Sequence, residues 1–155
     1  VQACRYPPVG RRGAAFGFAQ CDYLGGDVGA KIRASHERTM VIAQIETERG
    51  LEQVEAIAAV DGIDVLWVGH FDLSNFLGMP AQFDNPRFDA AMRRVAEVAR
   101  RHGKAAGFMA TDAAWVARVR EMGYTMIAGG TDTGLLEAAM RQLVGHIDAP
   151  RAGPR

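Results

Sequence analysis

Three side chains that could bind a metal ion stand at the ends of two predicted strands. Gln44 and Glu46 are two residues apart in a short apolar stretch, and side chains at that spacing in a strand point the same way. Asp72 lies just beyond the next apolar stretch, and neighbouring parallel strands run about 4.8 Å apart. The Glu46 and Asp72 carboxylates can therefore converge on one point.

Two convergent carboxylates suit a hard divalent cation. Mg2+ or Mn2+ would take oxygen ligands here, with waters or substrate oxygens completing roughly six positions. Co2+ and Zn2+ are further candidates. The alternative for a lone Glu and a lone Asp is a pair of solvated or salt-bridged loop carboxylates. The two residues by themselves leave both interpretations open.

The surrounding sequence alternates short apolar runs with amphipathic stretches, which is typical of βα units on a parallel sheet. The pattern predicts strands over 40–46, 64–69, 104–109 and 124–128. It predicts helices over 47–59, from Asn85 as N-cap to Gly103, over 112–122 and after Thr131, with an intervening loop over 70–85 and a helix or irregular segment around 22–34. Apolar residues of the last helix are expected to face inward, namely Leu135, Leu136, Ala139, Met140 and Leu143.

Four βα units amount to half of a (β/α)8 TIM barrel, so the predicted fold class is α/β with a partial barrel. Half a barrel leaves two strand edges and one side of its core uncovered. We therefore expect an upstream segment, or a second copy of the chain, to complete it. The start at Val1 without a methionine fits a piece of a longer protein. We expect one domain over 1–147 and a flexible tail over 148–155, where Pro, Gly and Arg gather.

Composition narrows the classes of partner. Lysine plus arginine number 18 and aspartate plus glutamate number 18, so the chain offers no electrostatic footprint for nucleic acid or an anionic membrane. The apolar runs are too short to span a bilayer, and we expect a cytoplasmic protein that binds a small molecule. Cys4 and Cys21 lack the spacing of a zinc site and are expected to be reduced thiols. Trp67 and Trp115 are interpreted as packing residues.

Several segments resemble motifs of one known enzyme family. Gln44-Ile45-Glu46-Thr47 and the stretch from Val68 to Ser74 are similar to the metal-binding motifs of the HpcH/HpaI aldolases. Supporting similarities lie at residues 5–13, 103–107 and 128–136, in the family's order. The resemblance runs from about residue 1 to 147 and corresponds to strands five to eight of the barrel.

The resemblance implies roles for individual residues. Glu46 and Asp72 would ligate the metal, Gln44 would lie in the pyruvate pocket, and the backbone around Phe71 would approach the substrate carboxylate. The implied activity is a metal-dependent aldolase that joins pyruvate, or another 2-oxo acid, to an aldehyde through an enolate, or cleaves the product. The family also implies a homo-oligomer, often with exchanged C-terminal helices.

Two departures from the family pattern stand out. His70 occupies a position where the family usually has proline. The family's general-base histidine and enolate-stabilising arginine belong to strands that would precede Val1, so no catalytic residue is assigned and the chain alone is expected to be inactive. His36, His102 and His146 are not expected to replace that histidine; a helix-dipole interaction explains His102. The alternatives are a citryl- or malyl-CoA lyase-like enzyme and a truncated, non-catalytic barrel fragment.

Overall fold

The protein is described by a computed structural model that covers residues 1–148, with side chains described through residue 147. The predicted tail therefore lies, except for Asp148, outside the described residues. The elements in chain order are η1 (Ala19–Cys21), α1 (Val28–Arg38), β1 (Ile42–Ile45), α2 (Glu48–Glu52), α3 (Val54–Ala58), β2 (Val65–Val68), α4 (His70–Phe76), α5 (Pro86–Arg101), β3 (Ala105–Met109), α6 (Ala113–Glu121), β4 (Met126–Ala128) and α7 (Asp132–Asp148).

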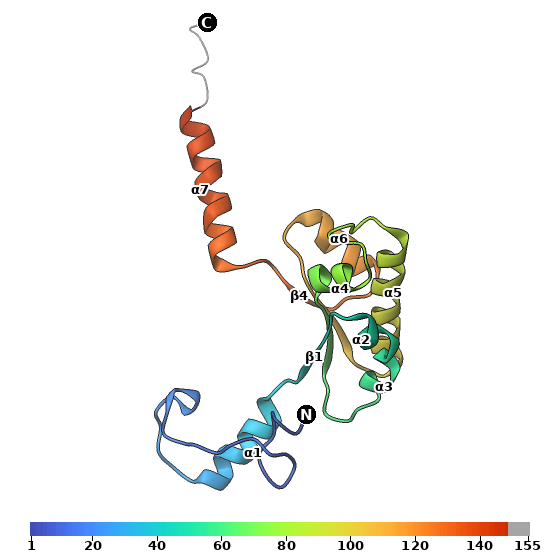
Figure 1. The fold of residues 1–155 in the computed structure, drawn as a ribbon. Coiled ribbons are helices and arrows are strands. Elements are labelled where there is room, and N and C mark those ends of the chain that lie inside the picture. The colour runs from blue at the N-terminus through green and yellow to red at the C-terminus, as the bar shows by residue number, and fades with distance from the viewer. Residues whose placement is uncertain (149–155) are drawn as a thin grey trace, which may run out of the picture.

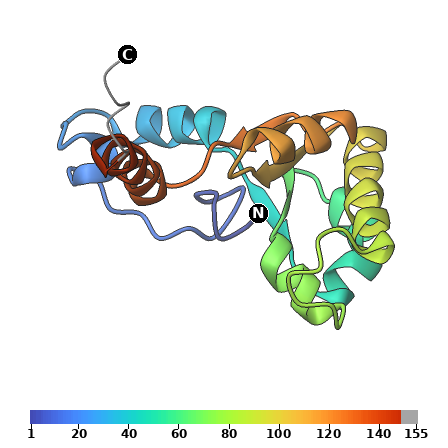
Figure 2. The ribbon, with the colours of Figure 1, turned by 90° about the horizontal axis from the view of Figure 1, so that it is seen from above.

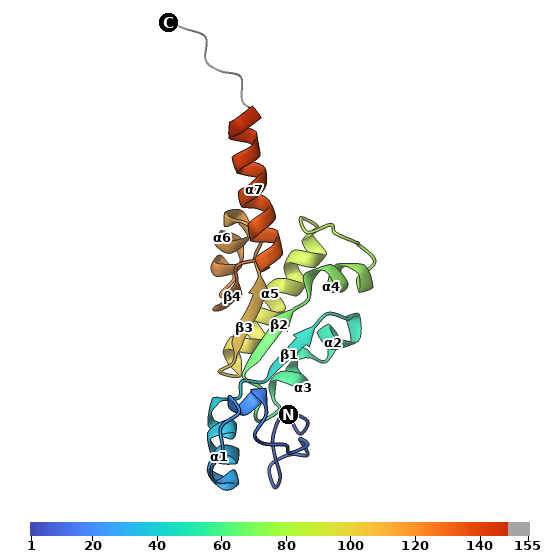
Figure 3. The ribbon, with the colours of Figure 1, turned by 90° about the vertical axis from the view of Figure 1, so that its left-hand side faces the viewer.

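The strands form a four-stranded parallel sheet in the order β1-β2-β3-β4, seen side by side in Figure 3. Ile45 pairs with Val68 and Trp67 pairs with Gly107. The alternation of strands and helices predicted from the sequence is thus confirmed, and all carboxyl ends of the strands meet at one edge. The strands are one to three residues shorter than the predicted runs.

Helices α2 to α6 gather on one side of the sheet, whereas α1 and α7 stand off on the other side (Figures 1 and 2). The core lies between the sheet and the covering helices, because the alternate strand residues and the apolar faces of α3 and α5 meet there. Its largest fully buried side chains are Phe88, Phe108, Ile45, Leu66, Leu73, Met92, Val54, Val65, Val68, Val95, Val98 and Val119.

The longest covering helix, α5, begins and ends at its predicted signals. The Asn85 side chain accepts a hydrogen bond from the Arg87 N–H at 3.0 Å, and Pro86 holds the first helical position. At the other end Gly103 has a φ of 65°, the left-handed conformation that glycine adopts most easily.

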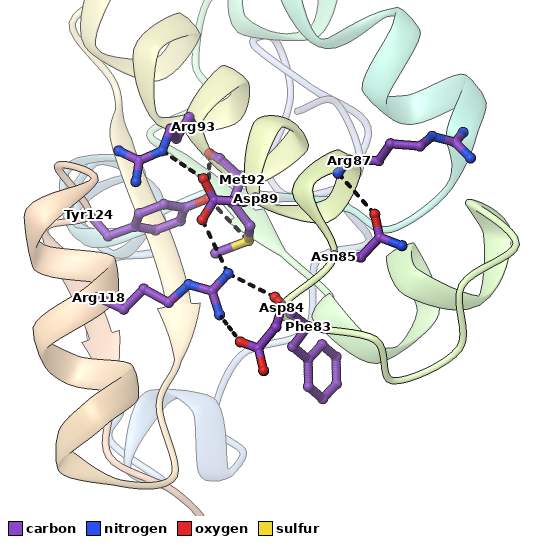
Figure 4. A network of polar contacts seen from close by, with 9 residues as sticks. All are labelled: Phe83, Asp84, Asn85, Arg87, Asp89, Met92, Arg93, Arg118 and Tyr124. Carbon is purple, nitrogen blue, oxygen red and sulfur yellow. Dashed lines mark hydrogen bonds and ion pairs between the residues drawn. The ribbon is translucent and has the colours of Figure 1, made fainter.

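A network of hydrogen bonds and ion pairs connects α6 to α5 and to the loop that precedes α5 (Figure 4). The Arg118 guanidinium donates to the Phe83 carbonyl at 2.7 Å and to Asp89 at 3.1 Å. Asp89 also accepts from Arg93 at 2.8 Å, and hydrogen bonds from Arg93 and Arg118 hold the pKa of Asp89 below its usual value. The buried Tyr124 hydroxyl donates to the Met92 carbonyl at 2.9 Å, and burial raises its pKa.

Two predicted segments differ from the structure. The helix predicted over 47–59 is split at Gln53 into α2 and α3, and only the second piece contributes fully buried residues, Val54 and Ala58. The loop predicted over 70–85 begins with helix α4, which starts directly after β2. The Ser74 hydroxyl, which accepts from the Ala81 N–H at 3.0 Å, ties the rest of that loop back onto this helix.

Helix α7 corrects the expectation that its apolar residues face inward. It leaves the end of β4 and points away from the sheet (Figure 1), so Leu135, Leu136 and Leu143 are 60%, 65% and 54% exposed. The periodic apolar face exists as predicted, but within residues 1–148 nothing covers it. No helix in this described part is both long and apolar enough to cross a membrane.

Candidate metal centre

Gln44 and Glu46 lie on the face of β1 that the helices leave uncovered. Val41 and Ile45 are buried toward the helices, at 7% and 0% exposure, whereas Gln44 is exposed and Glu46 partly exposed. The Gln44 amide N–H donates a hydrogen bond to Glu46 Oε2. The alternation of the strand therefore brings these two side chains together, as the sequence predicts.

Gly69 leaves the space that the Glu46 side chain occupies. Its N–H donates to the Ile45 carbonyl at 3.2 Å, which places the end of β2 beside the end of β1. A Cβ on Gly69 would lie 2.8 Å from Gln44 Nε2 and 2.9 Å from both Cβ and Oε2 of Glu46. The Glu46 carboxylate thus lies against Gly69, three residues before Asp72 in the chain.

Asp72 is an exposed carboxylate in the first turn of α4. The helix starts at once after Gly69, since the Leu73 N–H already donates to the Gly69 carbonyl at 2.8 Å. Among the hydrogen bonds and ion pairs formed within residues 1–148, none involves the Asp72 side chain. Its oxygens are therefore available to a ligand.

These donors fit a hard divalent cation. Glu46 and Asp72 offer carboxylate oxygens and Gln44 offers an amide oxygen, the ligand types that Mg2+ and Mn2+ take. In the described part of the chain, no group of three or more His, Cys, Asp or Glu side chains gathers where it could hold a metal ion. Two carboxylates would therefore leave most positions of a six-coordinate ion to waters, neutral groups and substrate oxygens.

His70 is a packing residue beside the centre. It is 7% exposed, and its ring lies between those of Phe71, Phe83, Phe108 and Trp115, at centroid distances of 4.7, 5.4, 4.8 and 5.8 Å. Burial lowers the pKa of His70, which favours the neutral imidazole. The sequence gives no sign of this aromatic cage because three of the four rings come from distant positions.

The two tryptophans that the sequence predicts to be packing residues differ in position. Trp115 packs against the core as predicted. Trp67 lies on the uncovered face of the sheet, where a Cβ on Gly107 would be 2.5 Å from its Cε3 atom. Gly107 therefore makes room for the indole.

The other histidines belong to other elements of the fold. His36 Nε2 accepts a hydrogen bond from the Tyr6 N–H at 2.9 Å. His102 Nε2 lies 2.9 Å from Glu55 Oε2. The sequence predicts only a helix-dipole interaction for His102 and does not identify Glu55 as its partner. His146 is exposed on α7. Cys4 and Cys21 are free thiols, as expected.

Curated proteins with known activities match almost the whole chain. A hydroxypyruvate/pyruvate aldolase of Pseudomonas aeruginosa is 33% identical over 99% of this chain and 57% of its own length. One of Chromohalobacter salexigens is 36% identical over 93% of the chain and 56% of its own length. A 2-keto-3-deoxy-L-rhamnonate aldolase of Klebsiella pneumoniae is 34% identical over the full chain and 58% of its own length. The chain thus spans little more than half the length of these relatives.

Solved structures give the same relationship. An HpcH/HpaI aldolase/citrate lyase family protein from Burkholderia cenocepacia is 32% identical and superposes with a TM-score of 0.85, over 96% of this chain and 58% of its own. An HpcH/HpaI aldolase from Desulfitobacterium hafniense is 29% identical, with a TM-score of 0.83, over 99% of this chain and 60% of its own. The family model described as HpcH/HpaI aldolase/citrate lyase matches residues 1–139. The chain therefore belongs to the HpcH/HpaI aldolase/citrate lyase family.

Proposed function

We propose that this chain belongs to a divalent-metal-dependent aldolase that forms or cleaves aldols of pyruvate or another 2-oxo acid. The observation that supports it best is that the Glu46 carboxylate lies against the side-chain-free Gly69. Asp72 follows Gly69 by three residues, and its side chain forms no hydrogen bond or ion pair within residues 1–148. Such an arrangement offers two anionic ligands at the carboxyl edge of neighbouring strands, where βα folds carry their sites. The aldolase activities of the relatives agree with this proposal.

The chemistry of the reaction sets what each residue must do. C3 of the 2-oxo acid loses a proton and forms a bond to the aldehyde carbon, while the aldehyde oxygen takes up a proton, so all atoms are kept in the aldol. A bound divalent cation would stabilise the negative charge that develops on the keto oxygen. Glu46 and Asp72 would hold that cation, Gln44 would orient Glu46 through its amide, and the backbone at Phe71 would adjoin the substrate carboxylate.

The same proposal includes the larger assembly. The parallel order of β1 to β4 is compatible with strands five to eight of a (β/α)8 barrel, with residues 1–147 as its C-terminal part. The exposed apolar face of α7 supports a homo-oligomer, because exposed leucines at helical spacing are favourable to bury against another chain.

Replacing Asp72 by alanine tests the metal centre. The variant is made in the complete protein, because this chain alone is expected to be inactive. It is measured for aldol formation from pyruvate and glycolaldehyde with added Mg2+ or Mn2+, and for Mn2+ binding by calorimetry. Replacement of a group that merely supports a metal ligand costs about 10–100-fold, so we expect Asp72→Ala to lower activity at least about 100-fold. Asp61→Ala is the matched control, because it removes an exposed carboxylate near the opposite end of β2.

Two results would refute the proposal. One is an Asp72→Ala protein with wild-type turnover and wild-type Mn2+ affinity. The other is a wild-type activity that persists after chelation and dialysis. Circular dichroism and urea unfolding of both variants establish that any loss comes from the site, since Asp72 is exposed and its side chain has no hydrogen bond or ion pair within residues 1–148.

A further inference from the structure

A series of aromatic rings begins at the residue before the proposed metal ligand Asp72. Phe71, which directly precedes Asp72, is 57% exposed although its neighbour His70 is buried. The Phe71 ring meets the edge of Phe83 at a centroid distance of 5.2 Å, and Phe83 meets Trp115 at 5.5 Å. Phe71, Phe83 and Trp115 thus form a continuous aromatic strip that starts beside a proposed metal ligand.

The strip ends in an open cavity of about 300 Å3. This cavity lies at the carboxyl edge of the sheet, because its wall includes Asp112, which caps α6 just after β3. The proposed metal ligands stand at the same edge, after β1 and β2. Its lining residues are Phe83, Asp84, Asp112, Ala114, Trp115 and Arg118.

The charges around the cavity disfavour an anionic guest. Among the described residues, Arg118 is the one cation that lines it, and this guanidinium already binds Asp84, Asp89 and the Phe83 carbonyl (Figure 4). It also lies 5.1 Å from the Trp115 ring. The lining contains two carboxylates, Asp84 and Asp112, against this one arginine. A ligand carboxylate would meet net negative charge and a cation that is already paired.

We propose that the aromatic strip binds the substituent of the acceptor aldehyde and selects neutral aldehydes with aryl or alkyl groups. Phe71 is then a specificity-determining residue, since it alone of the three rings adjoins Asp72 in the chain. An aryl substituent would stack on or meet the edge of these rings. This proposal rests on the proposed aldolase function and adds the class of the second substrate.

The test compares three aldehydes with pyruvate as the donor: phenylacetaldehyde, glycolaldehyde and the anionic succinic semialdehyde. We expect the wild-type protein to have its highest kcat/KM with phenylacetaldehyde. Phe71→Ala should lower the ratio of kcat/KM for phenylacetaldehyde to that for glycolaldehyde about 10-fold, the range of one aromatic contact. Phe76→Ala is the control, because Phe76 is 59% exposed on the same helix and has no ring contact within residues 1–148; it should leave the ratio unchanged.

The outcomes separate the two proposals. Metal-dependent exchange of deuterium into the methyl group of pyruvate, followed by NMR without aldehyde in the complete wild-type protein that contains this chain, measures enolate formation alone. Absence of that exchange would refute the aldolase function itself. Exchange combined with no preference for phenylacetaldehyde, or with equal ratios in wild type, Phe71→Ala and Phe76→Ala, would overturn only the acceptor proposal.

Discussion

The substitution Gly69→Ala, which adds one methyl group, tests the geometry of the proposed site directly. Gly69 has φ −82° and ψ 83°, which alanine adopts without a positive φ, so the backbone needs no change. The new Cβ would instead lie 2.9 Å from Glu46 Cβ and 2.8 Å from Gln44 Nε2. Because Glu46 Cβ is bonded to the backbone at the end of β1, it cannot rotate away. The Glu46 side chain and the turn at Gly69 must therefore move apart.

The size of the effect follows from this contact. Overpacking by one methyl typically costs about 1–3 kcal/mol, which lowers stability without abolishing the fold. Displacement of the Glu46 carboxylate should weaken Mn2+ binding about 10–100-fold, since small shifts of metal-supporting groups have effects of that size. Metal affinity should therefore fall in a protein that still unfolds cooperatively in urea.

Calorimetric titration with Mn2+ and urea unfolding of the same preparation measure both quantities. Gly13→Ala is the control, because its Cβ would meet nothing within 4 Å and its φ lies outside the left-handed region. A Gly69→Ala protein that binds Mn2+ as tightly as wild type would show that Glu46 does not depend on the space over this glycine, and the proposed centre would lose its main geometric support.

Two further predictions concern stability and assembly. Arg118→Ala should lower the free energy of unfolding by about 1–2 kcal/mol through the lost bonds to Phe83 and Asp89, measured in urea. Because the folded state depresses the pKa of Asp89, the contribution of its carboxylate to the free energy of unfolding is present above the unfolded pKa and is lost as pH falls through the lower folded value. The loss of stability caused by Arg118→Ala should therefore shrink at low pH. A loss of stability that does not change with pH would contradict this ion pair. Leu136→Ser combined with Leu143→Ser, seven residues apart on the exposed face of α7, should weaken self-association in sedimentation, and an unchanged association state would remove α7 from the interface.

The sequence predicts those features that depend on neighbours in the chain. The period of two in β1 places Gln44 and Glu46 on one face, and the structure confirms this through their hydrogen bond. Asn85 and Pro86 mark the start of α5 because capping is a local interaction. Helix α4 escapes prediction because it has seven residues and its N-cap, Gly69, offers no side chain to accept a capping bond.

Features that depend on distant residues could not be predicted in the same way. The need for glycine at position 69 arises from side chains on β1, which the sequence separates by more than twenty residues. The burial of His70 requires Phe108 and Trp115 from two later elements. Periodicity identifies the apolar face of α7, but it contains no information on what covers that face, and the expectation of an inward orientation was wrong for this reason.

The two proposed metal ligands are held by different interactions, and this difference bears on how the site responds to change. Glu46 directly follows β1, which pairs with β2 over Ile42–Ile45, and its carboxylate accepts a hydrogen bond from the Gln44 amide, so its position depends mainly on the sheet. Asp72 lies on α4, whose buried residues pack against the core and, at His70, against four aromatic rings. Changes in the aromatic cage should therefore shift Asp72 relative to a stationary Glu46. The same cage carries Phe71, so metal affinity and acceptor selection are linked through the packing of one histidine.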